Sequence, residues 1–271
     1  LNVTGGNSLS TFTVGVIGTE LMNTTTLLSV DASAFTGNTK LFYDTDALLA
    51  TMALKAGALT TDTIEVIIDA AGSDLTYNTN GFETFTATMS TAGRTHTMSL
   101  EKMVGLTSLQ LASPNNVVFV ADEYVDSIQL QLGSAVGSEL DNGSSVDVNL
   151  ASSTGTSDTL NLKVVDTLDA IGSVDIDAAG VEVVNLVLGT GAESHVLNLA
   201  GITATTGSNV AYAITGGNAA DSLTISGLDS TVNVVDASAS LSAITMTGSS
   251  TTATTITSAA GADTLIMAHK N

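Results

Sequence analysis

Closely spaced aspartates recur along this chain, and their carboxylates could share a cation. In an Asp-x-Asp sequence on a strand, both side chains lie on one face, because alternate residues point the same way. Calcium (Ca2+) takes six to eight oxygen ligands, from carboxylates and from peptide carbonyls at turns. The candidate metal ligands of this kind are Asp44 with Asp46, Asp122 with Asp126, and Asp175 with Asp177. The alternative for each pair is a solvated strand edge, where charge discourages pairing between sheets.

Four further aspartates lie where a turn leads into a strand. Small residues precede an Asp-Thr or Asp-Ser pair, and alternating apolar residues follow it; these aspartates are Asp62, Asp158, Asp221 and Asp263. An aspartate at this position can accept a hydrogen bond from its own turn, while the next apolar residue points into the core. The pattern fits either a turn-capping role or calcium ligation. The candidate metal ligands among the four are Asp158, Asp221 and Asp263.

Motifs of familiar enzyme classes are missing from the sequence. It contains no His-Glu-x-x-His, no Gly-x-Ser-x-Gly and no phosphate-binding loop, and the Gly-x-Gly in 188–194 has neither a third glycine nor a following helix. A sugar-cleaving groove would need carboxylates beside Arg94 or Lys102, yet the chain has only 6 basic residues and no Trp to stack on sugars. The sequence therefore predicts that the chain is not an enzyme.

The composition indicates a folded, strongly acidic protein. Of its 271 residues, 44% are hydrophobic and 12% are charged, the reverse of the disordered signature. The formal net charge of −21 disfavours nucleic acid and anionic membranes as partners, because both are bound through Lys and Arg. Divalent cations are the expected partners. The absence of Cys favours export without disulfides, and no apolar run reaches the ~18 residues that a membrane helix needs. The chain opens on "LNVTGG" without a Met, so we expect a fragment of a longer protein.

Short strands with period-two alternation run through most of the chain. Examples are "TIEVII" (63–68) and "TLNLKV" (159–164), and turn clusters of Gly, Asn, Ser and Asp separate them. One segment differs, because "DTDALLATMALKAG" (44–57) is rich in helix formers and ends at Gly57, where a C-terminal glycine belongs. We expect a helix at roughly 46–56 in this segment.

Internal repeats organise the chain. Residues 81–89 align with 180–188 at a spacing of 99, and His96 then falls on His195. Repeat positions of this kind predict ladder or surface histidines rather than metal ligands.

A second repeat links residues 3–14 with 214–225, and it continues from 30–39 to 235–245. The predicted units are the tail of a preceding β-repeat unit at 1–43, a helical insertion at 44–57, and β-repeat units at 58–150 and 151–271.

Repetition of short strands and turns is typical of a β-solenoid. Each coil is too thin to bury its own apolar face, whereas stacked coils bury a continuous column of Val, Leu and Ile. The predicted fold is therefore all-β and solenoid-like, a parallel β-helix or β-roll, with one short helix. Tandem β-sandwich domains are the alternative, because they also give short strands at regular spacing.

Several of these repeats resemble a known family. "VDASAFTGNT" (30–39), "GVEVVNLVLGTG" (180–191) and the Asp-Thr-Leu strands are similar to the repetitive regions of bacterial surface-layer (S-layer) proteins, of the type I-secreted class with RTX-like calcium repeats. In "GGNAADSLT", the RTX pattern matches at Gly216, Gly217, Asp221 and Leu223, with Ala219 in place of the third glycine.

The resemblance implies an extracellular structural protein of the cell surface that self-assembles into a calcium-dependent lattice. Its partners would be copies of itself, divalent cations, and a cell-surface polysaccharide reached through a region outside this chain. The alternative is the stalk, or repeat segment, of a large secreted adhesin.

Overall fold

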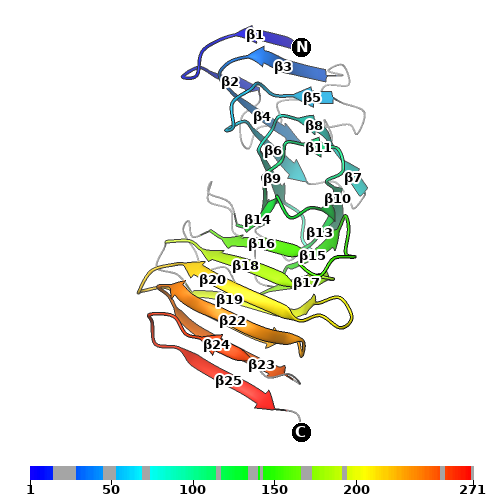
Figure 1. Cartoon of the computed structure of the whole chain (residues 1–271). Helices are drawn as coiled ribbons and strands as arrows, with labels where there is room; N and C mark the ends of the chain where they lie inside the picture. Colours follow the sequence, from blue (N-terminus) through cyan, green and yellow to red (C-terminus); the bar gives the residue numbers. More distant parts are fainter. Residues whose placement is uncertain are drawn as a thin grey trace.

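The computed structural model describes residues 1–14, 29–44, 53–68, 74–113, 117–133, 140, 143–165, 173–190, 194–250 and 254–269. Within these ranges the chain winds into a continuous stack of coils, with the N-terminus at one end of the rod and the C-terminus at the other (Figure 1). Every strand pair is parallel, as in β1 with β3 and β23 with β25. The predicted solenoid is confirmed, and the tandem β-sandwich alternative is wrong.

Three sheets run along the rod. Sheet A contains β1 (Asn2–Gly5), β3 (Ser29–Phe35), β5 (Ala53–Lys55), β8 (Asn78–Asn80) and β11 (Met103–Val104). Sheet B contains β2 (Thr11–Val14), β4 (Asn38–Asp44), β6 (Thr63–Ile68), β9 (Thr84–Met89), β12 (Ser108–Ala112), β14 (Gln129–Leu132), β16 (Thr159–Val164), β18 (Val183–Leu188), β20 (Val210–Gly216), β22 (Val232–Ser240) and β24 (Thr255–Thr257). Sheet C contains β7 (Asp74–Thr76), β10 (Thr95–Ser99), β13 (Val118–Tyr124), β15 (Ser145–Leu150), β17 (Ser173–Ala179), β19 (Ser194–Thr203), β21 (Ser222–Leu228), β23 (Ala243–Ser250) and β25 (Thr264–His269).

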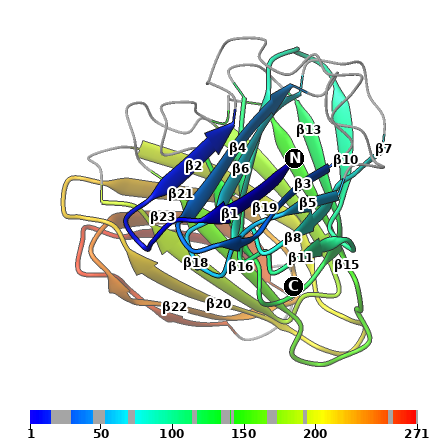
Figure 2. The same ribbon diagram turned by 90° about the horizontal axis from the view of Figure 1, so that it is seen from above.

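The cross-section of the rod changes along its length. From β5 to β13 the chain visits sheets A, B and C in turn, so each of these coils has three sides. After β11 sheet A ends, and the chain alternates between sheets B and C down to β25. Figure 2, seen along the rod, shows these sheets surrounding a common interior. Sheet B runs from β2 to β24 as one ladder and joins the predicted repeat units.

Alternating side chains build the core of this rod. In β16 the inward residues Leu160, Leu162 and Val164 are fully buried, whereas the intervening residues are half-buried. Parallel register places Leu162 between Leu130 and Leu186 on the neighbouring coils. Columns of branched apolar side chains therefore fill the interior, which is why Val, Leu and Ile dominate the strands.

The sequence repeats correspond to matching local geometry. Gly81 and Gly180 share a left-handed backbone with φ of 80°, a conformation that only glycine adopts without strain. Two residues later, the N–H groups of Glu83 and Glu182 donate to the carbonyl oxygens of Asp62 and Asp158, at 3.1 and 2.9 Å. The aligned stretches thus form the same entry into a sheet B strand.

The second repeat builds the same turn at two different corners. Asn7 accepts a hydrogen bond from the Leu9 N–H at 2.9 Å, and Asn218 accepts one from the Ala220 N–H at 2.8 Å. Each asparagine follows a Gly-Gly pair with positive φ. The first turn connects sheet A to sheet B, and the second connects sheet B to sheet C. The turn sequence therefore fixes a local bend and not a particular corner of the rod.

The predicted helix at 46–56 is wrong where the structure describes it. Ala53–Lys55 form β5, in which Leu54 pairs with Val30 on β3 and Thr79 on β8 and is 1% exposed. Stacking in sheet A overrides the helical preference of Ala, Leu and Lys. Residues 45–52 lie outside the described ranges. Over those ranges, no helix is long and apolar enough to cross a membrane.

Gly57, predicted to end that helix, lies at a tight coil corner. A Cβ atom at this position would be only 2.3 Å from the carbonyl oxygen of Phe35 on the preceding coil. Glycine is required here by the close approach of two backbones and not by a helix terminus.

Truncation of an inward side chain should destabilise the rod far more than truncation of its outward neighbour. We expect Leu186→Ala to lower the free energy of unfolding by about 2–5 kcal/mol, because it leaves a cavity in a stacked column. Val187→Ala, on the half-buried outer face of the same strand, is the control. Urea denaturation of both variants provides the measurement, and equal losses would contradict the assigned inward face.

Candidate functional site: the acidic coil corners

A buried glutamate connects three successive turns of chain at one corner. The Glu182 carboxylate, 4% exposed, accepts hydrogen bonds from the Asp158 N–H at 3.1 Å and the Thr205 N–H at 2.9 Å. The Asp158 carboxylate accepts the Gly155 N–H at 3.1 Å. Carboxylates that accept backbone N–H bonds satisfy donors that a tight corner would otherwise leave buried and unpaired. Asp158, a candidate metal ligand, thus caps its own turn.

The equivalent corner of the other repeat carries Asp62 and Glu83. Glu83 accepts the Asp62 N–H at 2.9 Å, as Glu182 accepts the Asp158 N–H. Asp62 is fully buried and accepts the Thr39 N–H from the preceding coil. Burial raises the pKa of Asp62. Burial also raises the pKa of Glu83, and the nearby Asp62 charge raises it further. The two corners share their backbone geometry but differ in how their carboxylates are satisfied.

A second acidic corner joins a serine, an aspartate and a histidine in the interior. The Ser242 hydroxyl donates to Asp221 Oδ2 at 3.1 Å, and Asp221 Oδ1 lies 3.4 Å from His195 Nε2. The side chains of Asp221 and His195 are completely buried. The carboxylate lies between hydroxyl and imidazole, whereas a nucleophilic serine needs the imidazole next to its hydroxyl. The arrangement cross-links neighbouring coils and does not activate the serine.

Both repeat histidines point into the core, so of the two predicted alternatives, ladder or surface residues, the surface location is wrong. His96 on β10 pairs with Phe119, His195 on β19 pairs with Leu223, and they are 2% and 1% exposed. Within the described ranges, neither ring nitrogen of His96 has a hydrogen-bond partner. Burial, and secondly the nearby Arg94 charge, lower the pKa of His96. His96 is therefore a neutral core residue near pH 7.

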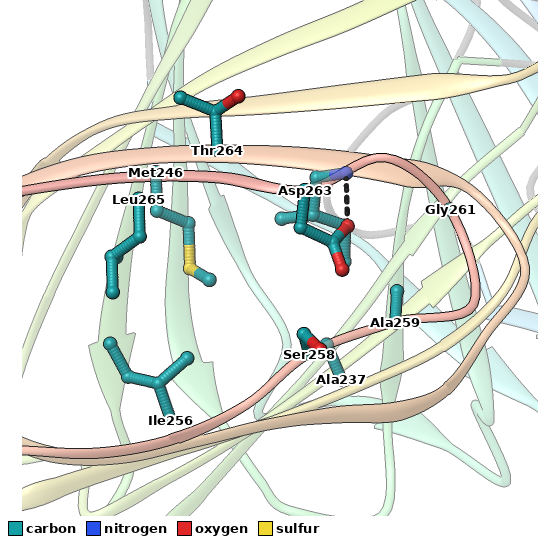
Figure 3. Close-up of a pocket in the computed structure, with 10 residues that line it drawn as sticks. Ala237, Met246, Ile256, Ser258, Ala259, Gly261, Asp263, Thr264 and Leu265 are labelled. Atoms are coloured by element: carbon teal, nitrogen blue, oxygen red, sulfur yellow. Dashed lines mark hydrogen bonds between the residues drawn. The ribbon is translucent and has the colours of Figure 1, made fainter.

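Asp263 lies beside a cavity at the C-terminal end of the described core. Its Oδ1 accepts the Ile244 N–H at 2.9 Å, so it also caps a corner. The cavity has a volume of about 420 Å³ and is lined mainly by apolar side chains, among them Met246, Ile256 and Leu265 (Figure 3). Asp263 is the one carboxylate among the residues that line this cavity, and the Ser258 and Thr264 side chains are the other polar groups of the lining.

Three of the predicted metal ligands, Asp122, Asp175 and Asp177, lie on the outer face of sheet C. Asp175 and Asp177 are exposed on β17, on one face as the Asp-x-Asp spacing predicts. Asp177 lies opposite Asp147 on β15, and burial followed by the Asp177 charge raises the pKa of Asp147. Asp122 accepts a hydrogen bond from Asn149 at 3.3 Å. This face therefore gathers carboxylates from three neighbouring strands.

The other predicted ligands do not join this group. Asp126 is exposed in the turn before β14, where its carbonyl oxygen accepts a hydrogen bond from Asn161 at 2.6 Å. Asp44 ends β4, and Asp46 lies outside the described ranges. Over the part of the chain that the structure describes, no three His, Cys, Asp or Glu side chains converge as metal ligands do. A cation would therefore need two carboxylates completed by hydroxyl or peptide oxygens.

Sequence reasoning missed the glutamates at the corners. Glu83 and Glu182 are the third residues of the aligned stretches, in the sequences "GFE" and "GVE". This shared position was the sequence feature that could have identified them. Thr39 and Asp147 carried no such signal, because their roles depend on residues of neighbouring coils.

Comparisons of this chain with protein-family models, curated proteins and solved structures found no match. Its function must therefore be argued from the fold, the charge distribution and the repeat motifs.

The Glu182 corner should contribute strongly to stability. We expect Glu182→Gln to lower the free energy of unfolding by about 2 kcal/mol, because one amide oxygen cannot accept both buried N–H groups as well as a carboxylate does. Asp175→Asn, which neutralises an exposed acid, should change it by less than about 0.5 kcal/mol. Chemical denaturation at pH 7 compares the two, and a Glu182→Gln variant as stable as Asp175→Asn would refute this role.

His96 should make the protein sensitive to mild acid. Its pKa in the folded state lies below the value of about 6.5 in the unfolded chain, so the unfolded state takes up a proton first. Stability is therefore lost as pH falls from about 6.5 towards the folded pKa. We expect His96→Leu to reduce the fall in thermal midpoint between pH 7.5 and pH 5. Thr97→Val, on the outer face of β10, should keep the wild-type pH dependence, and an unchanged slope in His96→Leu would contradict the assignment.

Proposed function

We propose that this chain is a structural cell-surface protein that assembles with copies of itself into a calcium-dependent S-layer lattice. The proposal rests on the solenoid fold, on the acidic outer face of sheet C and on the resemblance of the repeats to S-layer sequences. Its mechanism is assembly and not turnover, and an extracellular location follows from that role.

The fold provides a stiff body for such a lattice. Sheet B is a parallel ladder that extends from β2 to β24, and the buried apolar side chains form one core along the described chain. A rod of stacked coils resists bending, because bending would break backbone hydrogen bonds on one side and compress side chains on the other. Repeated coils also present repeated outer surfaces to a neighbouring molecule.

The outer face of sheet C is the observation that carries the proposal. Exposed Asp175 and Asp177 lie beside half-buried Asp147 in register, in a chain with 27 acidic and 6 basic residues. Two such faces repel each other in the absence of cations. Divalent cations between them would replace repulsion with shared carboxylate ligands, and assembly would then depend on calcium.

The interior chemistry also favours a structural role over catalysis. The buried carboxylates of Glu182 and Asp221 are engaged by groups from neighbouring coils. Arg94 and Lys102, the basic residues that a sugar-cleaving groove would use, are exposed.

A calcium titration tests the proposed assembly. Starting from EDTA-treated protein, we expect millimolar CaCl2 to increase light scattering and to give ordered two-dimensional sheets in negative-stain electron microscopy. NaCl at matched ionic strength should not do so, because screening alone does not bridge carboxylates. The double variant Asp175→Asn/Asp177→Asn should need a higher calcium concentration.

The same titration separates the lattice from the adhesin stalk. Protein that stays monomeric at millimolar calcium, as single extended rods, would rule out the lattice and favour a stalk. Assembly of the double variant at the wild-type calcium concentration would show that the interface between molecules does not lie on the acidic face of sheet C.

A further inference from the structure

Oxygen-bearing side chains form a column inside the corner between sheets A and B. Parallel register pairs Lys40 with Thr63, and Thr63 with Thr84. The residues just before them, Thr39, Asp62 and Glu83, therefore lie over one another on three successive coils, at the strand spacing of about 4.8 Å. Thr39 and Asp62 are fully buried, and Glu83 is half-buried.

Two buried oxygens in this column lack partners with hydrogen-bond geometry among the described residues. Asp62 uses Oδ1 to accept the Thr39 N–H, and the two oxygens left without such a partner are Asp62 Oδ2 and the Thr39 hydroxyl. The Thr39 hydroxyl and the Gly57 N–H lie near the carboxylate and favour its charged form. A buried charge of this kind is normally paired or bound to a metal ion.

No basic side chain compensates this charge. Among the groups of the described chain that shift the pKa of Asp62, none is a lysine or arginine. The next carboxylate in the column adds repulsion, because the Asp62 charge raises the pKa of Glu83. Glu83 itself is held in place by the Asp62 N–H at 2.9 Å. Two carboxylates on adjacent coils are thus fixed close together without a counter-charge.

The equivalent corner of the second repeat shows a different solution. There the Asp158 carboxylate accepts the Gly155 N–H, and both oxygens of Glu182 accept backbone N–H groups. The backbone satisfies that acidic pair, whereas the pair in the first repeat keeps an unsatisfied carboxylate oxygen. The contrast marks the Asp62 corner as the place where an additional group is needed.

We propose that Thr39, Asp62 and Glu83 bind a divalent metal cation inside the coil corner. The donors are two carboxylates and a hydroxyl, hard oxygen ligands of the type that calcium prefers at 2.3–2.6 Å. Peptide carbonyls complete such sites, and those of Phe35 and Gly37 approach Gly57 at this corner. The half-buried Glu83 gives the ion access from solvent. This internal site does not depend on lattice assembly.

Calorimetry and thermal unfolding with CaCl2 test the site. For EDTA-treated wild type, we expect calcium at about a hundred times Kd to raise the thermal midpoint by about 5 °C. Asp62→Asn should bind one calcium ion fewer and lose this rise. Thr39→Val, which keeps the shape but removes the hydroxyl, should weaken binding at this site about tenfold. The matched control Asp158→Asn should keep the wild-type response.

Each alternative outcome is distinguishable. An Asp62→Asn variant with the full calcium response would overturn the site and leave the proposed lattice untouched. A wild type that ignores calcium but gains stability relative to Asp62→Asn on acidification from pH 7 to pH 5 would show that Asp62 holds a proton instead and would overturn the site. One tight calcium ion in a protein that never assembles would support this site and overturn the lattice.

Discussion

Parallel stacking of successive coils is the constraint on which this structure depends. A strand inside a sheet forms its backbone hydrogen bonds with the coils before and after it, and inward side chains in regular register lie over their counterparts on those coils. A column can therefore be apolar throughout, as at Leu130, Leu162 and Leu186. A polar residue is tolerated only if neighbouring coils supply its partners. The polar columns at the corners follow from this requirement, because a turn leaves N–H groups without strand partners and carboxylates can accept them.

The repeats show how one corner sequence can diverge in chemistry while its backbone stays the same. Asp62 and Asp158 enter sheet B strands through the same hydrogen bonds. The Asp158 carboxylate accepts the Gly155 N–H, whereas Asp62 Oδ2 has no partner with hydrogen-bond geometry among the described residues. His96 and His195 are both inward-facing, yet only His195 has a buried aspartate beside it. In each case the backbone position is retained, and a residue on another coil decides the electrostatics. Copies of a repeat in a solenoid thus need not share a function.

Acidic residues divide into two groups with different physical roles. Those at inner corners, such as Glu182 and Asp221, bind groups of neighbouring coils and hold the rod together. Those on the outer face of sheet C, such as Asp175 and Asp177, are exposed. Their repulsion must be relieved by cations if rods are to pack side by side. Stability and assembly therefore depend on separate carboxylates, which allows the two properties to be altered independently by substitution.

The sequence by itself determined the class of fold and the location of the corners. Period-two alternation, turn glycines and repeated Asp-Thr or Asp-Ser steps are local signals, and the backbone at Gly81 and Gly180 follows them. Parallel strands, the strand at Ala53–Lys55 and the inward histidines were decided by the tertiary structure. Each of these depends on which coil lies above and below, and loops of varied length between coils shift that register. The partners of Asp62 could not be read from the sequence for the same reason, because Thr39 and Glu83 meet it only when the coils stack.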